Sequence, residues 1–236
     1  MKNKFYNLFW EFVDLLFPPA CGGCKQPGVR WCETCQKQTK EIKPPICDIC
    51  GQSITAGNLC QRCQKLTPNF TAIRSWAEFN GPIRNALHDL KYRRNIGLGI
   101  SLAQHLVGLL QTCGWDINLV VPVPLGQARK QQRGYNQAAL LAQPLAHALQ
   151  LPYNPRILTR VRETQSQVEL SLIERQKNMQ GAFQAHSQKV QRQIILVIDD
   201  VTTTGSTLNA CAGALLEAGA QSVYGMTVAR AMLSNS

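Results

Sequence analysis

The sequence is poor in acidic residues and in histidine, and it has no long hydrophobic run. It contains 14 Asp and Glu against 25 Lys and Arg, so its formal net charge is +11. A positive excess of this size favours an anionic partner, either a nucleic acid or a polyphosphate ligand. The 4 histidines are scattered without ligand spacing and indicate no metal site. Because no apolar stretch approaches the ~20 residues of a membrane-spanning helix, the sequence predicts no transmembrane segment.

The N-terminal segment lacks the features of a secretion signal. Its basic start and apolar stretch resemble one, but Glu11 and Asp14 interrupt the stretch, and no small-residue cleavage site precedes Pro18. We therefore predict a docking helix over residues 1–19, with contact to a membrane surface as the alternative. The predicted location is the cytoplasm, with the inner face of the membrane as a second placement. The helix would present one apolar face, formed by Phe5, Leu8, Phe9, Phe12, Leu15 and Leu16.

Eight of the 10 cysteines form four C-x-x-C pairs near the N-terminus. A C-x-x-C turn points two sulfurs at one centre, and two such turns complete a tetrahedral thiolate site for Zn²⁺. Disulfides are the alternative, but the absence of a secretion signal favours a reducing compartment and hence zinc. We predict a double zinc ribbon over residues 20–66 with two structural zinc ions, bound by Cys21, Cys24, Cys32, Cys35, Cys47, Cys50, Cys60 and Cys63.

The spacing of the pairs bears on which cysteines share a metal. Short gaps separate the first pair from the second and the third from the fourth, while the stiff Lys43–Pro45 stretch divides the two halves. This spacing favours one zinc site formed by the first and second C-x-x-C pairs and another formed by the third and fourth. The interleaved pairing remains the alternative. The two other cysteines, Cys113 and Cys211, fall on apolar helix faces and are interpreted as core residues.

An apolar strand followed by two carboxylates is the main functional signal in the C-terminal part. The run Ile194–Ile198 is typical of a strand buried on both faces of a parallel sheet, and Asp199 and Asp200 follow it. In open α/β sheets, ligands bind at the carboxyl ends of the strands. A loop of hydroxyl residues with Gly205 then leads into a helix, and such a helix N-terminus binds phosphate. Helix capping alone needs only one such residue, so the pattern predicts a sugar-phosphate site.

A cationic segment is expected beside this site. The predicted strand Asn118–Leu125 is followed by the loop GQARKQQRGYNQ, which carries Arg129 and Arg133. One further crossover separates this strand from the acidic strand, so the two loops are expected to lie side by side. The polar segment Leu158–Phe183 lies between the two strands and carries Arg160 and Arg162 among its basic residues.

The stretch VIDDVTTTGSTL resembles the phosphoribosyl pyrophosphate (PRPP) signature of type I phosphoribosyltransferases. The resemblance implies an α/β domain over residues 69–236, a parallel sheet flanked by helices, preceded by the small zinc-ribbon domain. It implies that Asp199 and Asp200, the candidate catalytic pair, hold the ribose hydroxyls of PRPP, with Mg²⁺ bound alongside. It further implies a pyrophosphate loop with Arg129 and Arg133, a flexible loop with Arg160 and Arg162, and 5′-phosphate binding by Thr203, Thr204, Gly205, Ser206 and Thr207.

Over nearly its whole length the chain resembles the ComF family. The resemblance rests on FPPACGGC (Phe17–Cys24), LHDLKYRRN (Leu87–Asn95), VPVPLGQARKQQRGYNQAALLA (Val121–Ala142), the TRVRETQSQ…ERQKNMQGAF segment (Thr159–Phe183) and VIDDVTTTGSTL. It implies a role in natural competence, in the uptake and handling of single-stranded DNA beside a helicase-like partner.

Two functional hypotheses follow. The first is a PRPP-binding protein of DNA uptake, in which basic residues and exposed tyrosines such as Tyr92 and Tyr135 contact single-stranded DNA. On that hypothesis, DNA bound to the ribbons through Lys37 or Arg62 is a second arrangement. The alternative is a Mg²⁺-dependent phosphoribosyltransferase of nucleotide or base metabolism, a pentosyl-transferring glycosyltransferase without a DNA role. No sequence signature identifies an acceptor.

Overall fold

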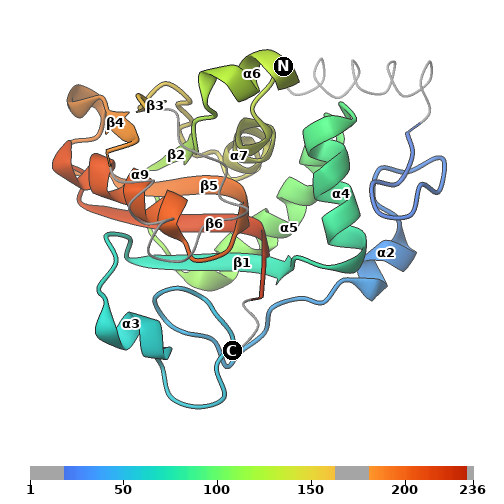
Figure 1. The fold of residues 1–236 in the computed structure, drawn as a ribbon, viewed down its shortest axis with the longest axis horizontal. Helices are drawn as coiled ribbons and strands as arrows, with labels where there is room; N and C mark the ends of the chain where they lie inside the picture. The colour runs from blue at the N-terminus through green and yellow to red at the C-terminus, as the bar shows by residue number, and fades with distance from the viewer. Residues whose placement is uncertain (1–18, 163–180, 233–236) are drawn as a thin grey trace.

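The computed structural model describes residues 19–162 and 181–232. Its centre is a four-stranded parallel sheet in the order β1–β6–β5–β2, and a separate antiparallel hairpin pairs β3 with β4 (Figure 1). The predicted N-terminal docking helix and most of the predicted flexible loop lie outside the described residues. Within the described part of the chain, no helix combines the length and the apolar character needed to cross a membrane. The strands are β1 (Ala72–Glu78), β2 (Leu119–Pro122), β3 (Leu158–Arg160), β4 (Phe183–Ala185), β5 (Ile194–Thr202) and β6 (Ser222–Arg230).

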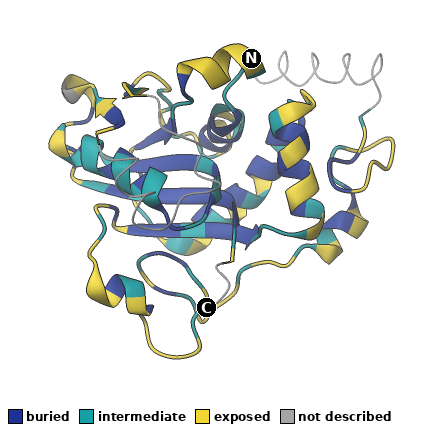
Figure 2. Ribbon diagram, in the orientation of Figure 1, coloured by how far each residue is buried: buried dark blue, intermediate teal, exposed yellow. Residues whose placement is uncertain are grey.

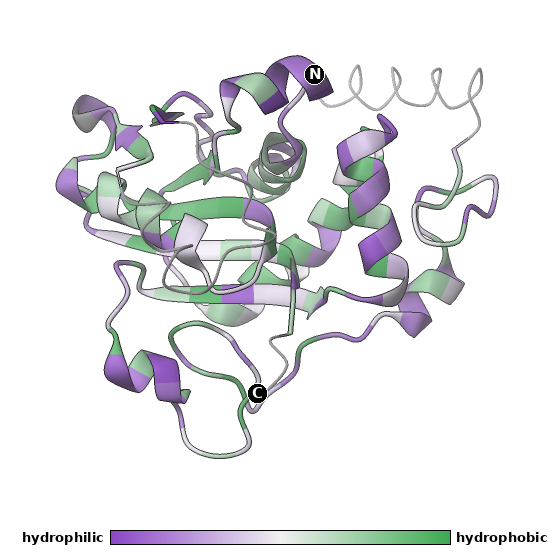
Figure 3. Cartoon of the chain, viewed as in Figure 1, coloured by the Kyte–Doolittle hydropathy of each residue, from purple (hydrophilic) through white to green (hydrophobic). Residues whose placement is uncertain are grey.

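Helices cover both faces of the sheet. In β5, Ile195 and Val197 belong to the core on the α9 side, whereas Leu196 and Ile198 belong to the core formed with α4, α5 and α7. Since consecutive side chains of a strand point to opposite faces, a strand covered on both sides requires a continuous apolar run. The sheet is accordingly buried and largely hydrophobic (Figures 2 and 3). The helices are α4 (Gly81–Tyr92), α5 (Leu98–Cys113), α6 (Gln127–Arg133), α7 (Gln137–Ala148), the 3₁₀ turn η1 (Ser187–Lys189) and α9 (Ser206–Glu217).

This architecture confirms the predicted fold class: a parallel sheet flanked by helices, with a cysteine-rich segment before it. Two expected boundaries were wrong. Strand β5 continues through Asp199 and Asp200 to Thr202, because Asp199 still pairs with Thr227 and Thr202 with Arg230 of β6. The stretch predicted as a cationic loop is the short helix α6, which ends where Gly134 takes φ of 80°.

The cysteine-rich segment lies along the outer edge of the sheet. It contains two short helices, α2 (Glu33–Gln38) and α3 (Gln61–Lys65), and the chain between them runs beside β1 (Figure 1). Ile42 N donates to Trp76 O at 2.9 Å, and Ile73 N donates to Ile49 O at 2.7 Å. An exposed edge strand is a template for unwanted pairing, so these contacts both attach the segment and cover the edge.

Candidate functional site

The carboxyl end of β5 carries the two predicted carboxylates. Asp200 is buried, with 3% of its surface exposed, and Asp199 beside it is half-buried. The Asp200 backbone N–H donates to Asp199 Oδ1 at 2.9 Å, which constrains the orientation of the Asp199 side chain. The pair therefore lies at the sheet edge where open α/β folds bind ligands.

Three helices contribute side chains around Asp200. Lys91, at the end of α4, forms an ion pair with Asp200 Oδ2. Gln137, at the start of α7, donates from Nε2 to Asp200 Oδ1 at 3.2 Å. Arg133 of α6 donates in turn to Gln137 Oε1. The buried Asp200 carboxylate is thus paired with a cation and a hydrogen-bond donor, as a buried charge requires for stability.

Sequence reasoning missed Lys91 and Gln137. Both lie inside motifs that carry the family resemblance, so their position was a usable signal. A lone lysine or glutamine on a helix is usually solvated, however, and no local pattern distinguishes these two. Their proximity to Asp200 depends on how α4 and α7 pack against the sheet.

The two adjacent carboxylates influence each other's ionisation. Burial and the neighbouring negative charge of Asp200 raise the pKa of Asp199 to about 8, although the Lys91 ammonium opposes the shift. The charge of Asp200 also raises the pKa of Lys91 despite burial, and there it stabilises the charged form of its partner instead of opposing it. Asp199 is therefore a carboxylate whose ionised form needs a further cation or hydrogen-bond donor.

The residues predicted to bind phosphate, 203–207, comprise the connection between β5 and α9 and the first two residues of α9, and are called the hydroxyl turn. Gly205 occupies the position before the first residue of α9 with φ of 80°, a left-handed conformation that favours glycine. Thr204 Oγ1 lies 2.6 Å from Ser206 Oγ and accepts from Ser206 N at 3.3 Å. The turn borders a hollow of about 290 Å³ whose lining includes Thr204, Ser206 and Arg62 of α3.

The predicted cationic residues are divided between two places. Arg133 reaches the acidic pair through Gln137, whereas Arg129 is exposed on α6. Arg160 lies in β3 with its guanidinium 5.7 Å from the centre of the Phe183 ring, and its Nε donates to Arg162 O at 3.4 Å. The structure thus links Arg133 to Asp200 through a chain of hydrogen bonds.

The eight predicted metal ligands form two four-cysteine clusters, with the first pair joined to the second and the third to the fourth. This confirms the pairing that the spacing favoured. Within each cluster the sulfurs lie within 4.8 Å of one another, and the Cys21–Cys35 and Cys50–Cys60 sulfurs are 3.6 Å apart. Thiolates arranged tetrahedrally around Zn²⁺ at ~2.3 Å are separated by about 3.8 Å. The geometry therefore fits two structural zinc sites without an open coordination position.

The first ribbon is attached mainly to α4. Lys25 forms an ion pair with the buried Asp89, and Asn85 Nδ2 donates to Gly23 O at 3.0 Å. Its cysteine cluster packs only with Trp31 among the hydrophobic residues that the structure describes. Because α4 also carries Lys91, this ribbon braces the helix that pairs with Asp200.

The second ribbon belongs to the core of the main domain and is joined by Arg230 to the hydroxyl turn. Its four cysteines pack in the same cluster as Phe70, Ile73 and α9. The buried Arg230 guanidinium donates to Cys50 O and, at 3.1 Å, to Thr203 O. Its Nε has no hydrogen-bond partner among the described residues. Burial lowers the pKa of Arg230, while the nearby Cys50 thiolate opposes that shift.

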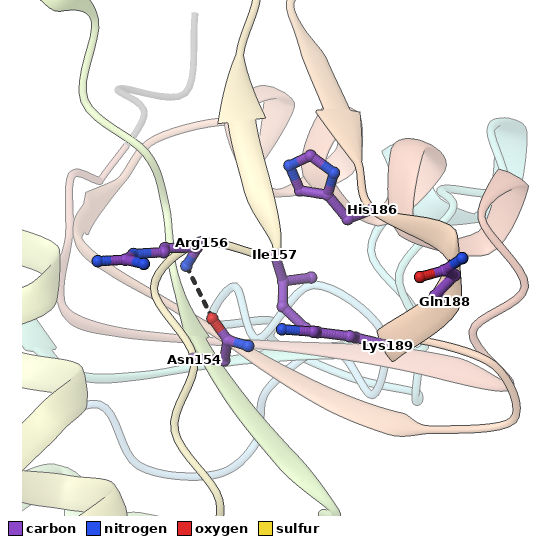
Figure 4. A pocket seen from close by; sticks show the side chains of 6 residues that line it. All are labelled: Asn154, Arg156, Ile157, His186, Gln188 and Lys189. Atoms are coloured by element: carbon purple, nitrogen blue, oxygen red, sulfur yellow. Dashed lines mark hydrogen bonds between the residues drawn. The ribbon is translucent and has the colours of Figure 1, made fainter.

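A separate hollow lies away from the acidic pair, near the β3–β4 hairpin. Figure 4 shows its lining, formed by Asn154, Arg156, Ile157, His186, Gln188 and Lys189. The hollow has a volume of about 410 Å³, and Asn154 Oδ1 accepts from Arg156 N at 3.0 Å. No predicted site residue lines it.

We predict that the two clusters differ in their importance for the whole fold. Cys35→Ser and Cys63→Ser should each lose one of two bound zinc ions, because each removes one of four thiolates. Only Cys63→Ser should strongly lower the midpoint of thermal unfolding, since its cluster lies in the main core. Metal analysis and thermal unfolding provide the measurements, with Cys113→Ser as the control that keeps both ions. Equal destabilisation by the two variants would contradict the prediction.

A second prediction concerns the pH dependence of stability without ligand. Because the pKa of Asp199 is about 8 in the folded chain and ~3.9 when unfolded, its stabilising contribution is complete below about pH 4. That contribution is lost as the pH rises towards about 8. Asp199→Asn keeps the side-chain oxygen and should remove this loss. The free energy of unfolding of the wild type and of Asp199→Asn, measured with urea at a series of pH values, tests this prediction. Parallel pH profiles of the two proteins would contradict it.

A third prediction concerns Arg230. Four thiolates around Zn²⁺ leave a net negative charge, which the adjacent guanidinium partly offsets. Arg230→Met should therefore release the zinc of the second cluster to a chelator at least several-fold faster than the wild type. The matched control is Arg74→Met, because Arg74 also donates to a ribbon carbonyl, Asp48 O, at 2.9 Å. Unchanged zinc release in Arg230→Met, or equal acceleration in both variants, would refute this role.

A family model described as a double zinc ribbon domain matches residues 12–64. The chain is 33% identical over 219 residues to the DNA utilization protein YhgH of Escherichia coli strain K12, a match that covers 89% of this chain and 96% of that protein. It is 32% identical over 209 residues to Competence protein F of Haemophilus influenzae, which covers 85% of this chain and 90% of that protein. Competence protein ComFC of Bacillus subtilis is 28% identical over 213 residues, or 87% of this chain and 86% of that protein.

Solved structures are more distant. Glutamine phosphoribosylpyrophosphate amidotransferase from B. subtilis matches with a TM-score of 0.36 and 20% identity, over 60% of this chain and 27% of that chain. A purine phosphoribosyltransferase from Pyrococcus horikoshii matches with a TM-score of 0.35 and 15% identity, over 55% of this chain and 71% of that chain. These structural similarities are too low to inform function, whereas the sequence relatives span nearly the whole molecule. The chain therefore belongs to the ComF family, as its sequence motifs predicted.

Proposed function

We propose that this protein binds PRPP with Mg²⁺ at the carboxyl end of β5 and acts in the uptake and handling of single-stranded DNA. The observation that supports PRPP most directly is the Asp199–Asp200 pair, in which the buried Asp200 is held by Lys91 and Gln137, followed closely by the hydroxyl turn at Gly205. Carboxylates suit ribose hydroxyls, and the start of α9 suits a 5′-phosphate. Arg62, which borders the same hollow as Thr204 and Ser206, adds a cation for that phosphate.

In this proposal each predicted group has one role. Asp199 and Asp200 hold the ribose hydroxyls, residues 203–207 bind the 5′-phosphate, and Arg129 and Arg133 face the pyrophosphate. Arg160, the last residue of β3, and Arg162, just beyond it, contribute further cations. Bound Mg²⁺ neutralises charge on the phosphate oxygens. Ionised Asp199 and Asp200 repel each other, so a ligand that brings a cation would stabilise the ionised form of Asp199.

The DNA role is supported by the relatives and by charge. Sequence relatives carry the names DNA utilization protein and Competence protein, and the net charge of +11 favours a polyanion. A competence helicase-like protein is the proposed partner. The alternative function is a Mg²⁺-dependent phosphoribosyltransferase without a DNA role. In that reaction the bond between C1 and the pyrophosphate oxygen breaks, pyrophosphate leaves with the electron pair, and C1 bonds to the acceptor.

We expect PRPP to bind only when Mg²⁺ is present, and Asp200→Asn to weaken binding by at least about tenfold. The reason is that one or more sugar hydroxyls would lose a charged acceptor, at about 1–3 kcal/mol each. Calorimetric titration of the zinc-loaded protein gives the affinities. Asp116→Asn is the control, since Asp116 is an exposed acid outside the site.

Two outcomes would count against the proposal. Equal PRPP affinity in Asp200→Asn and the wild type would mean that the turn binds some other phosphate. Pyrophosphate release with a small base as acceptor, together with no DNA binding at low salt, would favour the alternative transferase.

A further inference from the structure

The outer face of α4 presents three side chains in a row. Arg84, His88 and Tyr92 follow one another at intervals of four residues, which places them on one face of the helix, and all three are exposed. Tyr92 is 65% exposed, more than any other large hydrophobic side chain in the described part of the protein. The row is about 12 Å long, from the rise of ~1.5 Å per residue. A single base would cover only part of it.

The row borders a hollow of about 460 Å³. His88 and Tyr92 form a tilted ring pair with centres 4.9 Å apart, and the Arg133 guanidinium lies 5.3 Å from the centre of the Tyr92 ring. None of the residues that line the hollow in the described structure is acidic. They are Phe79, Arg84, Asn85, Leu87, His88, Lys91 and Tyr92.

This combination of features matches single-stranded nucleic acid. Aromatic faces stack on bases of any sequence, and neighbouring cations bind the backbone phosphates. The hollow also adjoins the acidic pair, because Lys91 lines it and forms the ion pair with Asp200. A strand bound there would lie beside the proposed PRPP site.

We propose that the hollow along α4 is a base-stacking site for single-stranded nucleic acid, in which His88 and Tyr92 stack on bases and Arg84 contacts a phosphate. The inference rests on the DNA role in the proposed function and gives it a location outside the cationic helix α6 and the ribbons. It requires no sequence readout, since stacking is tolerant of base identity.

The test uses the full-length, zinc-loaded protein and a labelled oligothymidylate, with binding followed by fluorescence anisotropy over a salt series. His88→Ala and Tyr92→Ala should each weaken binding about tenfold, and Tyr92→Phe should restore most of the affinity. Arg84→Ala should also reduce the slope of log affinity against log salt by about 0.7, whereas His88→Ala should leave that slope unchanged. The different slopes separate a phosphate contact from a stacking contact.

Matched controls come from the hollow in Figure 4, which offers the same two residue types in His186 and Arg156. His186→Ala and Arg156→Ala should bind the oligonucleotide as the wild type does. Photocrosslinking with iodouracil-substituted DNA should label the α4 peptide that contains His88 and Tyr92. Crosslinks confined to other segments, or losses of affinity confined to the control variants, would overturn the proposal.

The α4 proposal and the PRPP proposal are contradicted by different experimental results. Arg84→Ala and His88→Ala should retain PRPP affinity, because neither residue contacts the acidic pair or the hydroxyl turn. Loss of DNA binding in these variants while the wild type binds no PRPP would support the α4 site and refute the PRPP proposal. A wild-type protein that binds PRPP but no DNA at low salt would overturn the α4 site and leave the PRPP proposal intact.

Discussion

The ion pair between Asp200 and Lys91 is the interaction on which the arrangement of the candidate site depends. A carboxylate buried at the end of a central strand is strongly destabilising unless a cation and hydrogen-bond donors accompany it. Lys91 and Gln137 supply these partners and thereby hold the end of α4 and the start of α7 at the carboxyl edge of the sheet. The same constraint places the exposed row on α4 beside the proposed ligand site.

The two ribbons are attached to the rest of the protein in different ways. The first packs on α4 through the Lys25–Asp89 ion pair, so it acts on the acidic pair through the helix that carries Lys91. The second is part of the main core, and Arg230 joins its Cys50 carbonyl to the Thr203 carbonyl of the hydroxyl turn. Closed thiolate sites are structural rather than catalytic. In this chain they contact the elements that surround the proposed ligand site.

Most of the fold was predictable because its signals are local. The buried run of β5 is apolar at every position from Ile194 to Ile198, which is what a strand covered on both faces requires. One error arose where strand pairing overrides local preference: two adjacent carboxylates are a poor strand sequence, yet β6 continues to pair with them. The other concerned the polar stretch after β2, which forms the helix α6 instead of a loop.

The sequence by itself determined the two cysteine clusters, the acidic pair and the hydroxyl turn, since C-x-x-C spacing and a strand–turn–helix motif specify their geometry over a few residues. Only the tertiary structure decided that Lys91 and Gln137 meet Asp200 and that Arg230 meets Cys50, 180 residues away in the chain. It also decided that Arg84, His88 and Tyr92 border one hollow beside Lys91. Contacts of this kind depend on how helices pack against a sheet, and packing is set by the whole buried surface rather than by any short pattern.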